Sequence, residues 1–414
     1  MIRLLHTADW HLGQSLMGWS REEEHDRALA TLLDLAEARD IDALIVAGDV
    51  FDTQNPSEKA ERLFFRTLVA LRRRLPHVVA VVLAGNHDPA GRIEAPHPLL
   101  AELGVHVVGR IRRRDGAVDL DHHLLPLVPR DGGATVHLLA LPYLGPASLP
   151  PIDRRSEEPG SPVVRAVRAF HEETIAAARA RIGDAPLVLT GHLTVGGGLE
   201  SEGAERRILV GGEHAVPPDL FPDDLAYVAL GHLHRPQAIG RPTIRYSGSL
   251  FPLSASERDY DHGVSLVEIE AGATRVEHLS IPHPVRFLRL PARGSLPLEA
   301  LDAALADLAL DVETPLDLRP FVQPVIRLDG PAPGLKADLD RIAGAHPIRL
   351  VGHLVDRPSA DETATRLPES VDLADVAPAD LFARAFAVEH GTPPEPAHLE
   401  AFARLAEAVE RGED

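Results

Sequence analysis

The chain contains no cysteine among its 414 residues. Disulfide bonds, thiolate zinc sites and cysteine nucleophiles are therefore excluded. It also lacks an uninterrupted apolar run near the roughly 18 residues that a membrane-spanning helix needs. The opening MIRLLHTADWH has too short an apolar stretch for a signal peptide. We therefore expect a cytoplasmic protein that does not enter the membrane.

Positive charge is scarce as well. The chain has 42 Lys and Arg residues but 62 Asp and Glu residues, which gives a net charge of −20 at pH 7. Taken alone, this balance argues against a nucleic-acid-binding protein, since phosphate backbones attract basic surfaces. The arginines are unevenly spread, however, with clusters at 72–74 and 110–114. An acidic protein with local basic patches remains compatible with the sequence.

Several short apolar runs rich in Val, Leu and Ile end in polar residues. The runs IRLLH, ALIVAG, VVAVVLAG, PLVLTG and AYVALG have the length and composition of buried strands. Helical patterns at about 21–39 and 56–75 separate the first three. This alternation predicts an α/β fold whose sheets are covered by helices. Ligands of such folds collect beyond the carboxyl ends of the strands, where these polar residues fall.

The strand and helix pattern restarts at about residue 283, which divides the chain. We predict a catalytic domain over 1–282 and a small α+β domain over 283–355. An acidic, proline-containing linker is expected over 356–378 and a pair of helices over 379–414. The Phe and Leu residues of this tail have no evident core of their own to enter, which suggests that they contact a partner.

The polar residues at the strand ends form five motifs in order: D-x-H, G-D-x-x-D, G-N-H-D, G-H and G-H-x-H. Their members are Asp9, His11, Asp49, Asp52, Asn86, His87, Asp88, His192, His232 and His234. Any one motif is compatible with an ordinary polar residue at a strand end. Five of them, each after a predicted strand, indicate a shared site.

This ordered set resembles that of the calcineurin-like metallophosphoesterases. The resemblance implies a two-sheet core flanked by helices and a site for two divalent metal ions. Mixed carboxylate, imidazole and amide ligands suit Mn²⁺ or Fe²⁺, and Mn²⁺ is the metal the resemblance implies. By the same resemblance, one ion takes Asp9, His11 and His234, the other takes Asn86, His192 and His232, and Asp49 bridges the two.

The resemblance also separates two neighbours in the G-N-H-D motif. Asn86 supplies a neutral oxygen, which limits the negative charge of a site that must accept an anionic phosphate. His87 is implied to be a catalytic residue that contacts the phosphate and assists the leaving oxygen. Asp52 matches the position of the carboxylate that holds this histidine, and Asp88 is expected only to cap the next turn.

Longer strings narrow the resemblance. HTADWHLG, AGDVFDTQNPS, LAGNHD, TGHLTVGG, VALGHLHRPQ and YSGSLFPLS together resemble the SbcD family, the nuclease subunits of bacterial SbcCD double-strand-break repair complexes. The resemblance implies a DNA nuclease of repair and recombination. Its activities would be exonuclease on double-stranded ends and endonuclease on hairpin or single-stranded DNA.

The same resemblance implies partners. The 283–355 segment matches a capping domain, and the tail matches the helices that grip an SbcC-like coiled-coil ATPase. The nuclease subunit is expected to be a homodimer within a heterotetramer, joined through helices in 56–75 and 90–103. The apolar stretch around Leu63, Phe64 and Leu68 is the expected contact. A dimer shared with the ATPase would hold DNA without a basic chain overall.

Two functions of other classes remain as alternatives. A stand-alone small-molecule phosphodiesterase or phosphatase would use the same metal ligands but would not need the tail. A non-catalytic scaffold subunit would be expected to have lost part of the ligand set, and here the set is intact.

Overall fold

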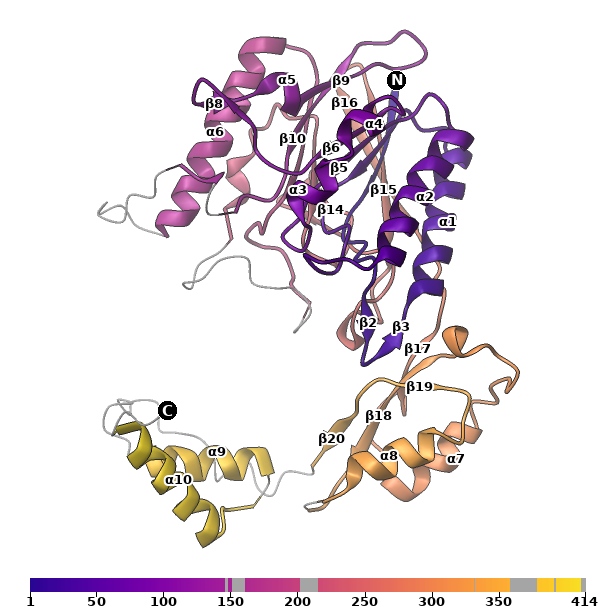
Figure 1. Cartoon of the computed structure of the whole chain (residues 1–414), viewed down its shortest axis with the longest axis vertical. Coiled ribbons are helices and arrows are strands. Elements are labelled where there is room, and N and C mark those ends of the chain that lie inside the picture. Colours follow the sequence, from indigo (N-terminus) through magenta and orange to yellow (C-terminus); the bar gives the residue numbers. More distant parts are fainter. Residues whose placement is uncertain are drawn as a thin grey trace. The chain divides into compact units, whose positions relative to one another are not determined.

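The computed structural model describes residues 1–145, 148–150, 161–201, 215–330, 332–357, 378–390 and 392–410. The chain divides into two compact units, Met1–Arg286 and Phe287–Asp414 (Figure 1). This division lies close to the boundary predicted after residue 282. The predicted linker, 356–378, falls almost wholly outside the described residues.

Two six-stranded sheets form the first unit, as the two-sheet prediction requires. The first sheet has the order β16-β15-β1-β4-β5-β6 and the second β13-β14-β12-β11-β10-β9. The first is built from β1 (Ile2–Thr7), β4 (Ala43–Val46), β5 (Val79–Leu83), β6 (Val105–Val108), β15 (Gly263–Glu270) and β16 (Ala273–Ser280). The second is built from β9 (Leu124–Leu127), β10 (Val136–Leu141), β11 (Leu187–His192), β12 (Tyr227–Gly231), β13 (Gln237–Ile239) and β14 (Arg241–Tyr246).

The central strands run parallel and are buried on both faces. In β4, Ala43 and Ile45 enter the core between the two sheets, while Leu44 and Val46 enter the core under the helices. Strands covered on both sides have no polar face, which is why the sequence shows continuous apolar runs instead of alternation. Because β1, β4 and β5 are parallel, their carboxyl ends meet at one edge.

The helices cover the outer faces of the sheets. The two predicted helices are confirmed as α1 (Glu22–Ala38) and α2 (Glu58–Arg74), whose apolar faces pack on the first sheet. The helix α6 (Pro162–Ile182) packs on the second sheet. Shorter elements are α3 (Ala90–Glu94), α4 (His97–Ala101), α5 (Leu120–His123) and the strands β2 (Ser15–Leu16), β3 (Trp19–Ser20), β7 (Arg113–Arg114) and β8 (Ala117–Val118).

Two of the three apolar residues expected to join two copies, Phe64 and Leu68, belong instead to the core of this chain, whereas Leu63 is only partly buried. Phe64 is 0% and Leu68 is 1% exposed, and both pack under α2 against the first sheet. Side chains that are already buried cannot form a contact with a second copy. On the surface of this region, the exposed apolar side chains are Val69 on α2 and Leu99 on α4.

The second unit contains a small parallel sheet in which β18 is central. Its elements are β17 (Phe287–Leu290), α7 (Leu301–Ala306), β18 (Phe321–Arg327), α8 (Leu335–Ala343), β19 (Arg349–Leu350) and β20 (Leu354–Asp356). Leu301, Leu305 and Leu339, on α7 and α8, form its core with Val322 and Ile326.

The chain ends in two helices, α9 (Pro378–His390) and α10 (Pro396–Glu410). They contact each other through aromatic rings, with Phe382 stacked on Phe402 at a centroid distance of 4.4 Å. None of the helices within the described ranges has the length and apolar character required to cross a lipid bilayer.

Candidate metal centre

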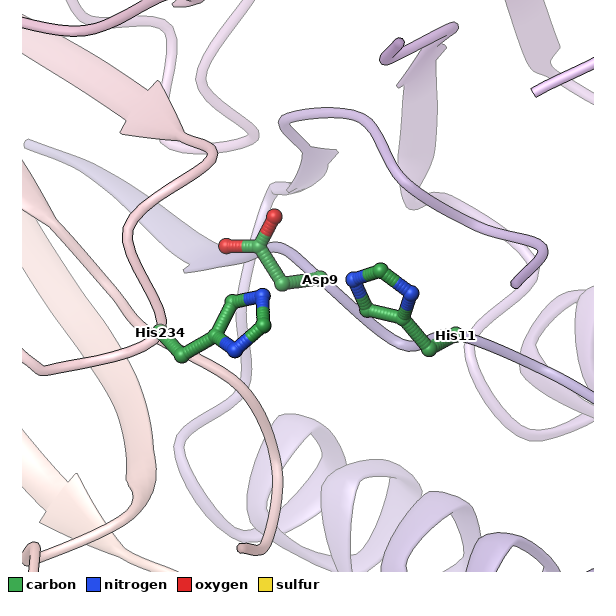
Figure 2. A group of neighbouring side chains, drawn as sticks. All are labelled: Asp9, His11 and His234. Carbon is green, nitrogen blue, oxygen red and sulfur yellow. The ribbon is translucent and has the colours of Figure 1, made fainter. Parts of the chain in front are cut away.

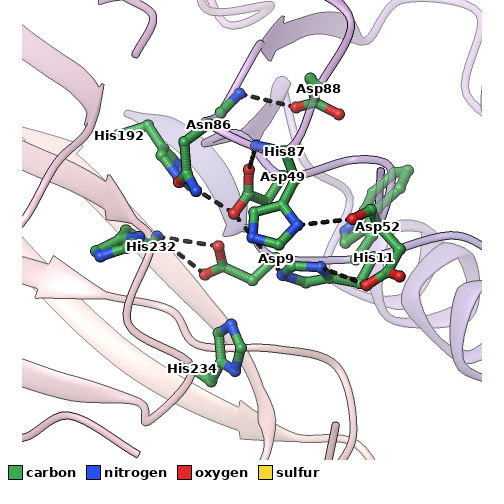
Figure 3. A network of polar contacts seen from close by, with 12 residues as sticks. Asp9, His11, Asp49, Asp52, Asn86, His87, Asp88, His192, His232 and His234 are labelled. Carbon is green, nitrogen blue, oxygen red and sulfur yellow. Dashed lines mark hydrogen bonds and ion pairs between the residues drawn. The ribbon is translucent and has the colours of Figure 1, made fainter. Parts of the chain in front are cut away.

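The predicted site residues gather where the carboxyl ends of strands from both sheets meet (Figure 3). The first sheet contributes the loops after β1, β4 and β5, and the second contributes the end of β11 and the loop after β12. The residues brought together are Asp9, His11, Asp49, Asp52, Asn86, His87, Asp88, His192, His232 and His234.

Two glycines allow these loops to approach one another. A Cβ atom on Gly85 would lie 2.1 Å from Asp49 Oδ1, and one on Gly231 would lie 2.0 Å from the main-chain oxygen of Ala47. Neither distance is tolerable between non-bonded atoms, so any side chain would push the loops apart. The glycine in the G-N-H-D and G-H-x-H motifs is thus required by close packing around the site.

The backbone is strained at the site. Asp9, His11, Asp49 and His232 have φ values of 53°, 46°, 50° and 108°, all in the region that favours glycine. Such conformations cost on the order of 1–3 kcal/mol each and persist only when the surrounding structure imposes them. Their concentration in four of the seven predicted ligands indicates that the fold holds these side chains in place for function.

One group of possible ligands consists of Asp9, His11 and His234 (Figure 2). All three are buried, and one ligand atom from each lies within 4.8 Å of the others. His11 Nε2 is buried and has no hydrogen-bond partner among the described residues. A buried nitrogen without a partner is costly, and a metal ion would satisfy it, so the residues fit a divalent cation.

A second buried group consists of Asp49, His192 and His232, again with one ligand atom each within 4.8 Å. Asn86 joins it, because its Oδ1 lies 2.9 Å from His192 Nε2. Asp49 Oδ2 lies 3.3 Å from His192 Nε2 and 3.7 Å from His11 Nε2. The Asp49 carboxylate therefore faces both groups, as expected of a bridging ligand.

The electrostatics of the centre favour a cation. Burial lowers the pKa of His192, but the neighbouring Asp49 carboxylate outweighs burial and raises this pKa to about 9. Burial likewise favours a neutral Asp49, yet the surrounding histidines, His192 above all, hold its pKa well below the usual range. Without metal, a proton on His192 supplies positive charge that a divalent ion would replace.

Burial favours the neutral form of two other groups, His232 and Asp9. Burial lowers the pKa of His232 well below its usual value, which keeps the imidazole in the neutral, ligating form. Burial raises the pKa of Asp9 to about 6, and its carboxylate accepts the main-chain N–H of His232 at 2.9 Å. That hydrogen bond joins the loop after β1 of the first sheet to the loop after β12 of the second sheet.

His87 lies beside these groups and is fixed from two sides. Its main-chain N–H donates to Asp49 Oδ1 at 2.8 Å, and its Nδ1 donates to the main-chain carbonyl of Asp52 at 2.7 Å. The Asp52 carboxylate lies 3.2 Å from His11 Nδ1. We predicted that the Asp52 carboxylate orients His87, and the structure shows that the Asp52 main chain contributes to this orientation.

Asp88 does more than cap a turn. Its buried carboxylate accepts the main-chain N–H groups of Val50, Phe51 and Gly85 at 3.1, 2.8 and 2.8 Å. The first two follow Asp49 and the third precedes Asn86. Asp88 therefore ties together the two loops that carry the central carboxylate and the G-N-H-D residues.

Sequence reasoning missed Glu257, a carboxylate that is 0% exposed and lies 2.8 Å from His234 Nδ1. It is 23 residues away from His234 in the chain and belongs to no motif. A single glutamate in a polar loop gives no signal in the sequence, so only the tertiary structure finds it.

Comparison with known proteins agrees with this geometry. The family model for calcineurin-like phosphoesterases matches residues 2–236. The SbcD subunit of the SbcCD nuclease from Rhodobacter capsulatus is 50% identical over 93% of this chain and 94% of its own length. The SbcD subunits from Bacillus subtilis and Escherichia coli K12 are 39% and 37% identical over 66% and 68% of this chain, and 67% and 68% of their own lengths. The chain therefore belongs to the calcineurin-like phosphoesterases and, within them, to the family of SbcD nuclease subunits.

Proposed function

We propose that the chain is a metal-dependent nuclease that acts as the SbcD subunit of an SbcCD-type complex. The observation that carries the proposal is the convergence of two buried ligand groups on the Asp49 carboxylate, with His87 beside them. The relative from Rhodobacter capsulatus, named a nuclease subunit, matches across both units of the chain. A scaffold without activity would not need this intact set.

The proposed ligands divide between the two ions as the family resemblance implies. Asp9, His11 and His234 would hold one divalent ion, Asn86, His192 and His232 the other, and Asp49 both. Bound there, such ions supply positive charge that polarises a phosphodiester and lowers the pKa of an attacking water. We propose Mn²⁺, the metal that the family resemblance implies, and the nitrogen and oxygen donors without thiolates are compatible with it.

His87 is proposed as the proton donor to the leaving oxygen. A carbonyl only accepts hydrogen bonds, so the Asp52 carbonyl fixes the hydrogen of His87 on Nδ1. This makes Nε2 the atom that can contact the phosphate and, when protonated, donate to the departing oxygen. The main-chain contact to Asp49 keeps the ring at the edge of the metal centre.

The proposed substrate is DNA, cut by exonuclease action on double-stranded ends and by endonuclease action on hairpins or single strands. With a net charge of −20, the chain is proposed to hold DNA together with its partners. These are an SbcC-like coiled-coil ATPase, bound by α9 and α10, and a second copy of the chain. We propose that the protein works in the cytoplasm.

The test compares two substrates. The purified chain, alone and with its ATPase partner, is incubated with Mn²⁺ and either linear duplex DNA or bis-p-nitrophenyl phosphate. We expect cleavage of the small diester by the chain alone and ATP-dependent degradation of DNA by the complex. Asp49→Ala, the matched inactive variant, should abolish both. If the complex left DNA intact while the chain hydrolysed small diesters rapidly, a stand-alone phosphodiesterase would be the better description.

A further inference from the structure

The Glu257 carboxylate is held by hydrogen bonds on both of its oxygens and contacts the ring of His234. Glu257 Oε1 lies 2.8 Å from His234 Nδ1, and the other carboxylate oxygen accepts the main-chain N–H of Leu253 at 2.8 Å. The carboxylate is 0% exposed. Burying a charge is expensive unless partners satisfy it, and here both oxygens are engaged.

Two further buried residues close a ring around this contact. His262 Nε2 lies 3.0 Å from the main-chain oxygen of Glu257, and His262 Nδ1 lies 3.1 Å from Ser249 Oγ. The main-chain N–H of Ser249 donates back to the main-chain oxygen of His234 at 3.0 Å. These hydrogen bonds form a closed ring through four residues, His234, Glu257, His262 and Ser249. None of the four is more than 3% exposed.

The hydrogen bond to Glu257 determines which nitrogen of His234 can bind a metal. A carboxylate only accepts hydrogen bonds, so the hydrogen of His234 lies on Nδ1 and Nε2 carries the ligating lone pair. A carboxylate behind a ligating imidazole also raises its basicity and fixes the orientation of the ring. His192, in the other group, has a neutral carbonyl in the corresponding place, Ala47 O at 2.8 Å from Nδ1.

The two proposed ligand groups therefore differ in which acceptor lies at Nδ1 of their histidines. His11 and His234 each have a carboxylate at Nδ1, from Asp52 and Glu257, whereas His192 has a main-chain carbonyl. We propose that Glu257 is a positioning residue that fixes the tautomer of His234 and so raises the affinity of the Asp9–His11–His234 group for its ion. This rests on the proposed two-metal function and adds a residue to it.

The experiment measures metal binding without turnover. Mn²⁺ stoichiometry and dissociation constants are determined by equilibrium dialysis and calorimetry for the full chain and for Glu257→Gln. We expect two ions on the wild type, and on the variant a loss of about 10–100-fold in affinity for one ion with the other unchanged. His234→Ala should weaken the same ion, and Glu257→Asp, which keeps the charge at shorter reach, should restore part of the affinity.

A matched control separates positioning from general stability. Glu24 is another buried carboxylate of the same unit, 2% exposed and paired with Arg21. Glu24→Gln should lower the unfolding midpoint in EDTA without changing either Mn²⁺ affinity. The proposal is overturned if Glu257→Gln and Glu257→Asp both bind two ions as the wild type does, or if Glu24→Gln weakens one ion equally. Fewer than two ions on the wild type would instead contradict the two-metal function.

Discussion

At the scale of single residues, the centre separates two adjacent side chains by function. Asn86 approaches His192 through its side-chain oxygen, whereas His87 is held by Asp49 and the Asp52 main chain, with Nε2 as the atom proposed to reach the substrate. Neighbouring residues after a strand point in different directions, so one motif can supply both a proposed ligand and a proposed catalyst.

Substitutions at these neighbours should therefore have different signatures. Asn86→Ala is expected to lower occupancy of one ion, with activity partly restored at high Mn²⁺ because mass action refills a weakened site. His87→Ala should keep both ions and lose roughly 10²–10⁴-fold in kcat, since it removes a proton donor. Metal analysis beside kcat for each variant checks this. Loss of an ion in His87→Ala, or its rescue by Mn²⁺, would make His87 a ligand.

The raised pKa of His192 predicts how metal binding depends on pH. With a pKa of about 9 in the metal-free protein, His192 is protonated at pH 7 and must release its proton before it can ligate. Mn²⁺ affinity should therefore rise with pH between 7 and 9, by up to about tenfold per unit from this group. Calorimetry at pH 7 in two buffers of different ionisation enthalpy should detect the released proton. Binding without proton release would contradict this, and His192→Gln should remove the effect.

At the scale of elements, the geometry of the site depends on hydrogen bonds between its loops. Asp88 joins the loops after β4 and β5, and the hydrogen bond from His232 to Asp9 joins the two sheets. The positive φ values of the ligands are uncommon for residues other than glycine, and these contacts hold the loops in which they occur.

Removing the hydrogen bonds of Asp88 should destabilise the loops after β4 and β5. Asp88→Asn keeps one acceptor oxygen but places an amide N–H₂ among main-chain donors, so we expect the free energy of unfolding to fall by roughly 2–4 kcal/mol. Mn²⁺ affinity should fall as well, because Asp49 and Asn86 lose their fixed separation. Urea unfolding in EDTA and Mn²⁺ binding are the measurements. Asp34→Asn, at a carboxylate that is 69% exposed, serves as the control. If Asp88→Asn unfolded and bound Mn²⁺ as the wild type does, Asp88 would not hold the two loops together.

At the scale of the whole molecule, the tail is expected to act apart from the chemistry. A chain truncated after residue 356 should keep Mn²⁺-dependent cleavage of bis-p-nitrophenyl phosphate but fail to co-purify with the ATPase. The reason is that the proposed ligands all lie in the first unit, while α9 and α10 carry the apolar side chains proposed to meet the partner. Leu399→Asp, on the exposed surface of α10, should weaken the complex in the full chain. Retention of the ATPase by the truncated chain would refute this role.

The proposed homodimer must use exposed side chains. Leu99 is 76% exposed and Val69 is 37% exposed, so Leu99→Asp and Val69→Asp should shift the chain from dimer to monomer. The physical reason is the cost of burying an unpaired charge at a packed interface. Sedimentation velocity measures the shift, with Val128→Asp at a 66% exposed site as the control. A wild type that sediments as a monomer would end the dimer proposal. Leu68→Asp is no test, because that residue lies in the core.

Sequence reasoning succeeded where the signal is local and repeated. Apolar strands followed by fixed polar motifs predicted the α/β fold, the helices at α1 and α2, and the residues that gather at the centre. It failed at Phe64 and Leu68, because an apolar helical stripe looks the same whether it packs on its own sheet or on another chain.

The sequence by itself determined the chemistry available to this protein: carboxylates, imidazoles and one amide at strand ends, with no thiol. Those residue types and their order do not depend on the rest of the chain. Only the tertiary structure decided how they are supported, since Glu257 and His234, or Asp88 and Val50, are far apart in sequence and meet through packing of the two sheets and their loops. Hydrogen-bond support between distant segments leaves no period or spacing in the sequence, because it depends on distances that exist only after the chain has folded.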